Sequence, residues 1–336
     1  MGIRVCFLYI FLSIGKNKKK GVYMCTAISC GGFAGRNLDI DRSYCGEVII
    51  TQRNYKLNFK KEKCINSHYA MIGIGVKMDG YPLYFDAANE KGLYMAALNY
   101  VGNAKYLSSA HNKVNLAPYE LIPYVLAKCK STAEAKYELE KINLVGIPFN
   151  DRLPLAELHF FIADKNESIT VEPDENGLNI YNNPIGVLTN NPSFPVQLFN
   201  LNNFQGLSST AKNYFSDELI FQEYSHGLGA LGLPGDLSSA SRFVRALFHK
   251  LNSQDEDSIG KTLRLLSSVA MPNGSVKTNV GYERTEYTSV VDLDKLIYCY
   301  RTYDSLCPYA LILSKDIVDG DKLITKELQT KKEPLY

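Results

Sequence analysis

Cys25 follows an internal methionine, and this pair offers the most compact chemistry in the chain. If the working protein begins at Met24 and then loses that residue, Cys25 carries a free α-amine beside its own thiol. A thiol has a pKa of about 8.5 and an N-terminal amine a pKa of about 8, so the amine can accept the thiol proton. The pair therefore predicts a cysteine nucleophile activated by its own amine.

Arg36 and Asp39 are the first charged residues after Cys25. An arginine near the sulfur would stabilise the thiolate, and an aspartate could hold the amine. Both side chains come near Cys25 if residues 25–29 and 35–38 pair as the two strands of a hairpin. The same Arg-Asn-Leu-Asp string is also typical of an exposed turn, and its spacing alone leaves both interpretations open.

Residues 1–24 must be absent if Cys25 is to act in this way, and we expect the full 336-residue form to be inactive. Residues 5–14 are apolar apart from Ser13, a run shorter than the roughly 20 residues that span a bilayer. Four lysines follow it, so a secretory signal fits poorly and a short signal anchor fits better. We favour a third interpretation. Codons for residues 18–24 would resemble a bacterial ribosome-binding site before a start codon, which makes residues 1–23 an untranslated leader.

Composition limits the partners of the chain. It has 37 basic and 35 acidic residues, a formal net charge of +2, and no basic block outside residues 16–20 and a dispersed group at 56–63. This pattern gives no electrostatic footprint for nucleic acid. The eight cysteines form no C-x-x-C pair, and no histidine lies among them at zinc-ligand spacing, so we expect neither metal nor cofactor. Scattered cysteines in a large chain suit a reducing cytosol, and we expect a cytoplasmic protein without stable membrane insertion.

Hydrophobic patterning predicts strands and helix pairs in alternation. Short runs rich in β-branched, aromatic and apolar residues predict strands at 47–52, 69–76, 93–100, 158–163, 168–172, 179–181, 185–188, 287–292, 295–302 and 309–313. Helical spacing and capping residues predict helices at 118–130, 131–142, 239–252 and 255–270. Residues 194–221 lack a period and predict an irregular excursion used in function or assembly.

This order of elements predicts an α+β fold. Strands, two helices, strands, two helices and strands suit two antiparallel sheets with a helix pair on each outer face. No linker divides the chain after the leader. We therefore expect residues 25–336 to form a single domain.

Five segments resemble the choloylglycine hydrolase family of N-terminal-nucleophile hydrolases, which includes bile salt hydrolases and penicillin V acylases. They occur in the family's order. The segments are Met24-Cys25-Thr26-Ala27 with Gly35-Arg36-Asn37-Leu38-Asp39, Asn89-Glu90-Lys91-Gly92-Leu93 with Ala97-Leu98-Asn99-Tyr100, Gly186-Val187-Leu188-Thr189-Asn190-Asn191-Pro192, Leu233-Pro234-Gly235-Asp236 with Ser241-Arg242-Phe243, and Tyr287-Thr288-Ser289. The resemblance implies a four-layer αββα sandwich with two antiparallel sheets, and an amidohydrolase that acts on linear amides.

The resemblance also implies roles near the start of the chain. Cys25 would be the nucleophile, and its own α-amine would be the base. Arg36 and Asp39 would flank it, with Asp39 orienting the amine or the thiol.

Three later residues would complete the site. By resemblance, Asn99 and Asn190 form the oxyanion hole, because a neutral amide donates hydrogen bonds to the tetrahedral intermediate. Arg242 would support the charge network around the thiolate. Taken singly, the two asparagines are typical of turns, and an arginine near a helix start is typical of the surface. The matched series of segments favours the functional interpretation.

Leu98-Asn99 favours bile salts over penicillin V as the substrate, because penicillin acylases of the family tend to carry an aromatic residue at the Asn99 position. We therefore expect hydrolysis of the amide between a steroid acid and glycine or taurine, through a thioester at Cys25. Arg36, Leu38 and Asn99 would bind the substrate. The sterol would lie among Leu38, Met78, Tyr81, Pro82, Phe85 and residues 144–149. A penicillin V acylase or an acyl-homoserine-lactone acylase is the alternative.

Two other classes of protein fit less well. A Cys-His protease needs a histidine poised near a cysteine, and the five histidines lie in no protease signature. Blocking the N-terminal amine would abolish the N-terminal mechanism and spare a Cys-His one. A non-catalytic binding or assembly protein would tolerate Cys25→Ala. The resemblance further implies a homotetramer, with residues 194–221 as the assembly element.

Overall fold

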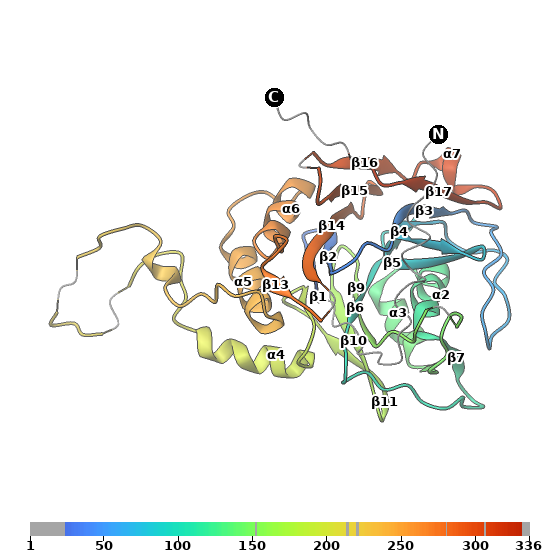
Figure 1. Cartoon of the computed structure of the whole chain (residues 1–336), viewed down its shortest axis with the longest axis horizontal. Coiled ribbons are helices and arrows are strands. Elements are labelled where there is room, and N and C mark those ends of the chain that lie inside the picture. Colours follow the sequence, from blue (N-terminus) through green and yellow to red (C-terminus); the bar gives the residue numbers. More distant parts are fainter. Residues whose placement is uncertain are drawn as a thin grey trace.

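Two large antiparallel sheets pack face to face, and helices cover the outer face of each (Figure 1). This computed structural model describes residues 24–151, 153–212, 215–219, 222–279, 281–305 and 307–330. The four layers confirm the expected αββα sandwich. The proposed leader at residues 1–23 lies outside the described residues.

The first sheet contains the N-terminal hairpin. Its strands follow the order β12-β1-β2-β14-β15-β16, with β13 beside β14, and the pairings are antiparallel. Their bounds are β1 Met24–Cys30, β2 Phe33–Ile40, β12 Val187–Leu188, β13 Val276–Lys277, β14 Tyr282–Asp292, β15 Ile297–Thr302 and β16 Tyr309–Ile312. Gly35 lets β2 lie close to β14, because a Cβ there would meet the Ser289 carbonyl oxygen at 2.1 Å. Strand β2 is therefore held tightly between β1 and β14.

The second sheet follows the order β11-β10-β9-β6-β5-β4-β3-β17 and is also antiparallel. Its strands are β3 Glu47–Thr51, β4 Met71–Met78, β5 Tyr81–Asn89, β6 Tyr94–Asn99, β9 Leu158–Ala163, β10 Ser168–Asp174, β11 Gly177–Asn182 and β17 Leu323–Glu327. Strands β9 and β10 are buried along almost their whole length, because both faces of this sheet are covered. A separate short parallel pair joins β7 Val114–Leu116 and β8 Ile142–Leu144.

Two helix pairs form the outer layers. Helices α2 Leu121–Lys128 and α3 Thr132–Leu139 cover the second sheet, and α5 Ser239–Asn252 and α6 Ile259–Ser267 cover the first. Three serines cap these helices by accepting a backbone N–H of the first turn: Ser131, Ser238 and Ser258. The predicted cap at Ser131 is therefore confirmed, although the Glu134 carboxylate accepts from the Lys130 N–H instead of completing a capping box.

Some predictions from patterning were wrong or incomplete. Residues 194–221, predicted to be irregular, begin with α4 Phe194–Asn200 and the 3-10 turn η2 Leu201–Phe204. Phe194 and Gln197 are buried against the sandwich, so tertiary packing supplies an order that no period indicated. Strands β5 and β17 were not predicted. The remaining short helices are η1 Pro118–Glu120, η3 Leu228–Ala230 and α7 Lys315–Val318.

No helix in the described ranges is both long and apolar enough to cross a membrane. The same residues contain no group of three or more His, Cys, Asp or Glu side chains placed to hold a metal ion.

Candidate active site

Cys25 and Arg36 meet across the first hairpin. Strands β1 and β2 pair so that Cys25 lies opposite Leu38, so of the two interpretations left open by the sequence the hairpin is the one that the structure has. Arg36 Nη2 donates a hydrogen bond to Cys25 Sγ at 2.6 Å. Its Nη1 donates to the carbonyl oxygens of Phe85 and Ala97 in the opposite sheet, at 2.9 and 2.6 Å. The fully buried guanidinium is thus fixed between the sheets with one edge on the sulfur.

Arg242 and Asn190 hold the backbone of the same cysteine. Arg242 lies in the first turns of α5 and is fully buried, where its position in the sequence alone is typical of the surface. Its Nη1 donates to the Cys25 carbonyl oxygen at 2.6 Å, and its Nη2 donates to Asn190 Oδ1 at 2.8 Å. Asn190 Oδ1 also accepts the Cys25 backbone N–H at 2.7 Å. Both backbone polar groups of Cys25 therefore have charged or amide partners.

Asp39 is the acidic member of this cluster. Its Oδ1 accepts the Thr285 hydroxyl at 2.6 Å, and its Oδ2 lies 4.0 Å from Arg242 Nη1. Burial raises the pKa of Asp39 to about 6, although Arg242 and the Thr285 hydrogen bond act against that rise. Oδ2 has no hydrogen-bond partner within the described part of the chain. Asp39 pairs with Met24 in the strand register, so this residue lies beside the peptide that precedes Cys25.

Opposing influences act on the Cys25 thiol. Burial raises its pKa above the ordinary value, and the charge of Arg36 lowers it. The charge of Asp39 raises it further, whereas the Asp39 backbone N–H and Arg242 lower it. The surroundings thus favour a protonated thiol at rest and supply two cations to a thiolate once it forms.

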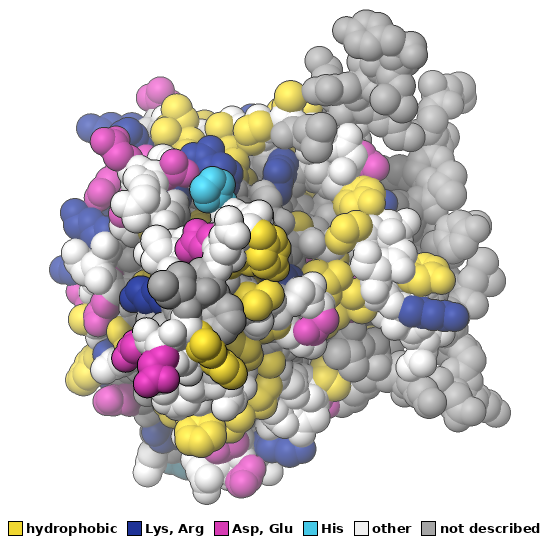
Figure 2. All heavy atoms as spheres, turned by 90° about the vertical axis from the view of Figure 1, so that its left-hand side faces the viewer, with side chains coloured by type: hydrophobic (Ala, Val, Ile, Leu, Met, Phe, Trp, Pro, Cys, Tyr) yellow, Lys and Arg dark blue, Asp and Glu magenta, His cyan; other side chains and the backbone are white. Residues whose placement is uncertain are grey.

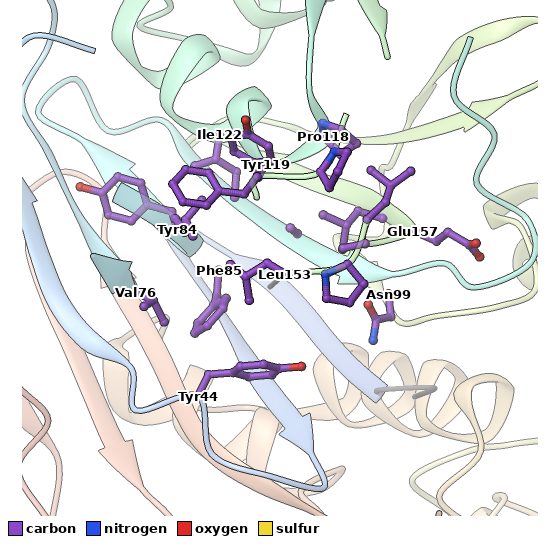
Figure 3. Close-up of a pocket in the computed structure, with 18 of the residues that line it drawn as sticks. Tyr44, Val76, Tyr84, Phe85, Asn99, Pro118, Tyr119, Ile122, Leu153 and Glu157 are labelled. Carbon is purple, nitrogen blue, oxygen red and sulfur yellow. The ribbon is translucent and has the colours of Figure 1, made fainter. Parts of the chain in front are cut away.

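A cavity of about 330 Å³ is lined in part by Cys25. Figure 3 shows several of the other residues that line it. Strands of both sheets, the start of α2 and the loop at 145–158 form its walls. Its lining is mostly apolar, and it comprises Cys25, Arg36, Leu38, Ile40, Tyr44, Val76, Met78, Leu83, Tyr84, Phe85, Ala97, Asn99, Val101, Pro118, Tyr119, Ile122, Ile147, Pro148, Phe149, Phe160 and residues 153–158. Such a site suits a bulky apolar ligand with one polar bond presented to Cys25.

Most of the predicted substrate contacts line this cavity. Leu38, Met78, Phe85 and residues 147–149 do so, whereas Tyr81, Pro82 and residues 144–146 do not. Tyr81 packs behind the wall, with its ring 5.8 Å from that of Tyr119. The sequence did not predict residues 153–158, because this proline-containing segment has no period and its one charged residue, Glu157, belongs to no motif.

Asn99 joins the cavity to the cluster around Cys25. Its side chain lines the cavity, at the same end as Glu157 in Figure 3. The backbone carbonyl oxygen of Asn99 accepts a hydrogen bond from Asn190 Nδ2 at 2.8 Å. Asn190 itself does not line the cavity. All six predicted catalytic residues are therefore connected, and only Cys25, Arg36 and Asn99 of them face the cavity.

Two buried acids near this cluster were not predicted. Glu283 on β14 is almost fully buried, and neither of its carboxyl oxygens has a hydrogen-bond partner among the residues that the structure describes. Burial and then the charge of Asp39 raise the pKa of Glu283 to about 8, against the effect of Arg242. Asp86 on β5 is fully buried and accepts hydrogen bonds from hydroxyl groups of the opposite sheet. No local pattern in the sequence marks either residue.

Comparison with known proteins agrees with this geometry. Residues 25–326 match the family described as "Linear amide C-N hydrolases, choloylglycine hydrolase family". The chain is 47% identical over 317 residues to a "Bile salt hydrolase/transferase" of Lactiplantibacillus plantarum, covering 92% of this chain and 98% of that protein. It is 36% identical to a protein of the same name from Clostridium perfringens, covering 87% of this chain and 91% of the relative.

Solved structures give the same result. A crystal structure of a mutant conjugated bile acid hydrolase from Clostridium perfringens superposes with a TM-score of 0.85 at 34% identity, covering 92% of this chain and 97% of that one. Penicillin V acylase from Agrobacterium tumefaciens shares the fold, with a TM-score of 0.70 at 19% identity and 94% of each chain covered. This chain belongs to the choloylglycine hydrolase family of enzymes that hydrolyse linear amide C–N bonds.

Proposed function

We propose that the chain hydrolyses the amide bond joining a steroid acid to glycine or taurine, with Cys25 as the nucleophile. The observation that carries this proposal is the position of the sulfur, which lines an apolar cavity of about 330 Å³ and accepts a hydrogen bond from Arg36 at 2.6 Å. Relatives named as bile salt hydrolases support the same substrate class. Apolar walls suit a fused ring system, because enclosing it removes apolar surface from water.

Activation requires that Cys25 become the first residue. In the described chain its nitrogen is a peptide nitrogen bonded to Met24, and such a nitrogen cannot act as a base. Two acceptors support an amine at this position: Asn190 Oδ1 lies 2.7 Å from the nitrogen, and Asp39 Oδ2 has no hydrogen-bond partner in the described residues. In the proposed mechanism these two groups orient the amine while it takes the thiol proton.

The proposed reaction proceeds through a thioester. The Cys25 thiolate attacks the amide carbon, and N–H groups of Asn99 and Asn190 stabilise the oxyanion that forms. The Cys25 ammonium then protonates the departing nitrogen of glycine or taurine. The amine next takes a proton from water, which attacks the thioester and releases the steroid acid. The position of Asn99 on the cavity wall and its link to Asn190 support this assignment.

Residues 1–24 are proposed to be absent from the active enzyme, with residues 25–336 as its single domain. The family match that begins at residue 25 supports this division. The intact mass and N-terminal sequence of the natively expressed protein test it. A mass that includes residues 1–23 would contradict the untranslated-leader hypothesis.

The function is tested by measuring glycine and taurine released from conjugated bile salts. We expect turnover from enzyme that begins at Cys25, and none from its Cys25→Ala variant or from chain that retains residues 1–24. Turnover by the Cys25→Ala variant would contradict the proposed nucleophile. Faster cleavage of penicillin V than of bile salts would contradict the substrate and favour the alternative acylase.

A homotetramer is proposed from exposed apolar side chains on the excursion at 194–221, which extends away from the sandwich in Figure 1. Val196, Phe199 and Leu219 are exposed there, Phe199 by 75%. Figure 2, viewed from that side, shows hydrophobic side chains on this face. Light scattering would show four chains for the wild type and a smaller mass for a Val196→Asp/Phe199→Asp variant. A Tyr137→Asp variant, altered at an exposed aromatic residue of α3, should keep the wild-type mass.

A cytoplasmic location is likewise proposed, and it rests on the scattered spacing of the cysteines in a large chain. Fractionation of the native host tests it. Activity in the medium or in the membrane fraction would contradict it.

A further inference from the structure

Asp86 is a buried carboxyl group that links the two sheets just behind Arg36. It lies on β5 of the second sheet. Its Oδ1 accepts the Tyr287 hydroxyl at 2.5 Å, and its Oδ2 accepts the hydroxyls of Tyr298 at 2.7 Å and Ser289 at 2.9 Å. These three donors belong to β14 and β15 of the first sheet. The Tyr94 hydroxyl, from β6, lies 3.4 Å from the same Oδ2.

This arrangement suits a charged carboxylate. Each hydroxyl group has one proton to donate, and an ionised carboxylate has only acceptor sites. Four hydroxyls aimed at one carboxyl therefore match the ionised form, whereas a protonated acid would have to donate to one of them. Burial raises the pKa of Asp86 above its ordinary value overall, and the charge of Arg36 and the hydroxyl donors limit that rise. Arg36 is thus the cation that this carboxylate faces.

Arg36 lies between Asp86 and the nucleophile. One Arg36 nitrogen donates to the carbonyl of Phe85, the residue before Asp86, and another donates to Cys25 Sγ. The guanidinium and the Asp86 carboxylate make no direct ion pair within 4.0 Å among the described contacts. Although burial lowers the pKa of Arg36, the charges of Cys25, Tyr287 and Asp86 raise it overall. One buried cation is therefore shared by two groups that can be anionic.

We propose that Asp86 is the counter-charge of Arg36 and limits how much of that positive charge is available to the Cys25 sulfur. Asp86 is a positioning residue in this proposal, because it acts through Arg36 and touches no reacting atom. The other charged groups around Cys25 are Asp39 on β2, Arg242 on α5 and, in enzyme that begins at Cys25, its own α-amine. Neither Asp39 nor Arg242 contacts Asp86, and the α-amine is the same in every variant compared. The effect on the thiol is independent of the substrate, and only its catalytic consequence rests on the proposed function.

The test is the pH dependence of thiol alkylation in enzyme that begins at Cys25. Iodoacetamide labelling of the Cys25 peptide would be followed by mass spectrometry, which separates it from the more exposed cysteines. In Asp86→Asn the negative charge is lost, so the positive charge of Arg36 is no longer offset and acts more strongly on the Cys25 sulfur. We expect the labelling midpoint to fall by about one pH unit, and labelling below the midpoint to become about tenfold faster.

A matched control and a second variant separate charge from packing. Asp292→Asn neutralises another buried carboxyl of the first sheet, at the far end of β14, and should leave the midpoint unchanged. Asp86→Glu retains the charge with altered geometry, and its midpoint should stay near the wild-type value even if its stability falls. A folded Asp86→Asn with an unmoved or higher midpoint would overturn the proposal. If that variant fails to fold, a lowered midpoint in Asp86→Glu would overturn it instead.

The result is distinguishable from failure of the proposed function. A shifted midpoint in protein that does not cleave bile salts would support the role of Asp86 and contradict the substrate. Normal bile salt cleavage with an unshifted midpoint would support the substrate and contradict the role of Asp86.

Discussion

On one face of strand β2, Arg36, Leu38 and Ile40 line the cavity, whereas helix α6 covers the opposite face and Arg242 of α5 reaches it. There Asn37 donates to the Leu266 carbonyl oxygen of α6, and Asp39 lies beside Arg242 of α5. The cavity face is largely apolar and open to a ligand. The covered face holds charges that a ligand never touches. Arg36 is the exception on the cavity face, because it also donates to Cys25 Sγ. Apart from Arg36, the strand separates the apolar side chains that face a ligand from the buried polar groups behind the nucleophile.

This difference has an energetic consequence. A buried charge that loses its partner costs several kcal/mol, because neither water nor a counter-ion replaces it. Losing an apolar contact in a cavity costs a free energy in proportion to the apolar area that is exposed to water again. Substitutions of polar residues on the covered face should therefore reduce both stability and turnover, whereas substitutions of the apolar residues on the cavity face should mainly reduce affinity.

The largest effect is expected for Arg242→Met on the covered face. It leaves Asp39 without its cation and removes hydrogen bonds to Cys25 and Asn190. We expect a loss of about 3–5 kcal/mol in the free energy of unfolding and at least about a hundredfold fall in kcat/KM. Urea denaturation and steady-state kinetics would measure both. Arg245→Met, on the same helix but bonded only to Pro234, Asp236 and Ser268, should lose stability without the loss of turnover.

Asn190→Ala should reduce kcat by about 10²–10³, the usual cost of losing one oxyanion donor. The same change removes the acceptor of the Cys25 nitrogen, so the effect should lie at the upper end of that range. Asn191→Ala provides the comparison, because Asn191 donates only to the Val101 carbonyl oxygen in the described contacts. Equal loss in both variants would show that the loop conformation matters more than the donor.

Glu283→Gln should change how stability depends on pH. Glu283 has a folded-state pKa of about 8 against an ordinary value of 4.5, so the folded protein binds a proton that the unfolded chain releases. The contribution of this bound proton to the free energy of unfolding is therefore complete below pH 4.5. It is lost as the pH rises to about 8, at a slope of about 1.4 kcal/mol per pH unit. The raised pKa of Asp39 likewise makes stability fall as the pH rises from about 4 to about 6.

Thermal unfolding between pH 5 and 8.5 would show this effect as a falling melting temperature in the wild type and a flatter profile in Glu283→Gln. Glu286→Gln, on the same strand and paired with Arg284, should retain the wild-type profile. Parallel profiles for the wild type and Glu283→Gln would refute the buried proton.

The smallest effect is expected for Leu38→Ala on the cavity face. The change enlarges the cavity next to Cys25 and leaves Arg36 and Asp39 in place. We expect KM for a conjugated bile salt to rise by about tenfold or less, equivalent to about 1.4 kcal/mol, with kcat almost unchanged. A fall in kcat at constant KM would contradict the expectation that apolar residues on the cavity face of β2 act on affinity and not on turnover.

Sequence patterning predicted the elements that carry the catalytic residues. The strand that ends at Asn99 and the helix that carries Arg242 have local signals, namely apolar runs, turn residues and caps. The hairpin from Cys25 to Asp39 was one of two interpretations that the spacing left open. The helix predicted at 239–252 coincides with α5. Local signals suffice there because each element is specified by its own residues.

The missed parts depend on distant packing. Asp86 is buried because Tyr287 and Tyr298, about two hundred positions later, meet it from the other sheet. Glu283 is buried because β14 inserts beside β2. The cavity wall at 153–158 depends on the second sheet beneath it. None of these relations leaves a pattern within a window of neighbouring residues, so only the fold itself reveals them.

The pairing of β2 with β14 also determines when an active enzyme can arise during synthesis. The hydrogen bond between Asp39 and Thr285 joins residues 246 positions apart, and Cys25 bonds to Arg242 across 217. A growing chain therefore exposes its cysteine long before the strand that completes the surroundings has been translated. Chains that terminate before β14 should form no partly active fragment. Activity should appear in a single step, close to the end of translation.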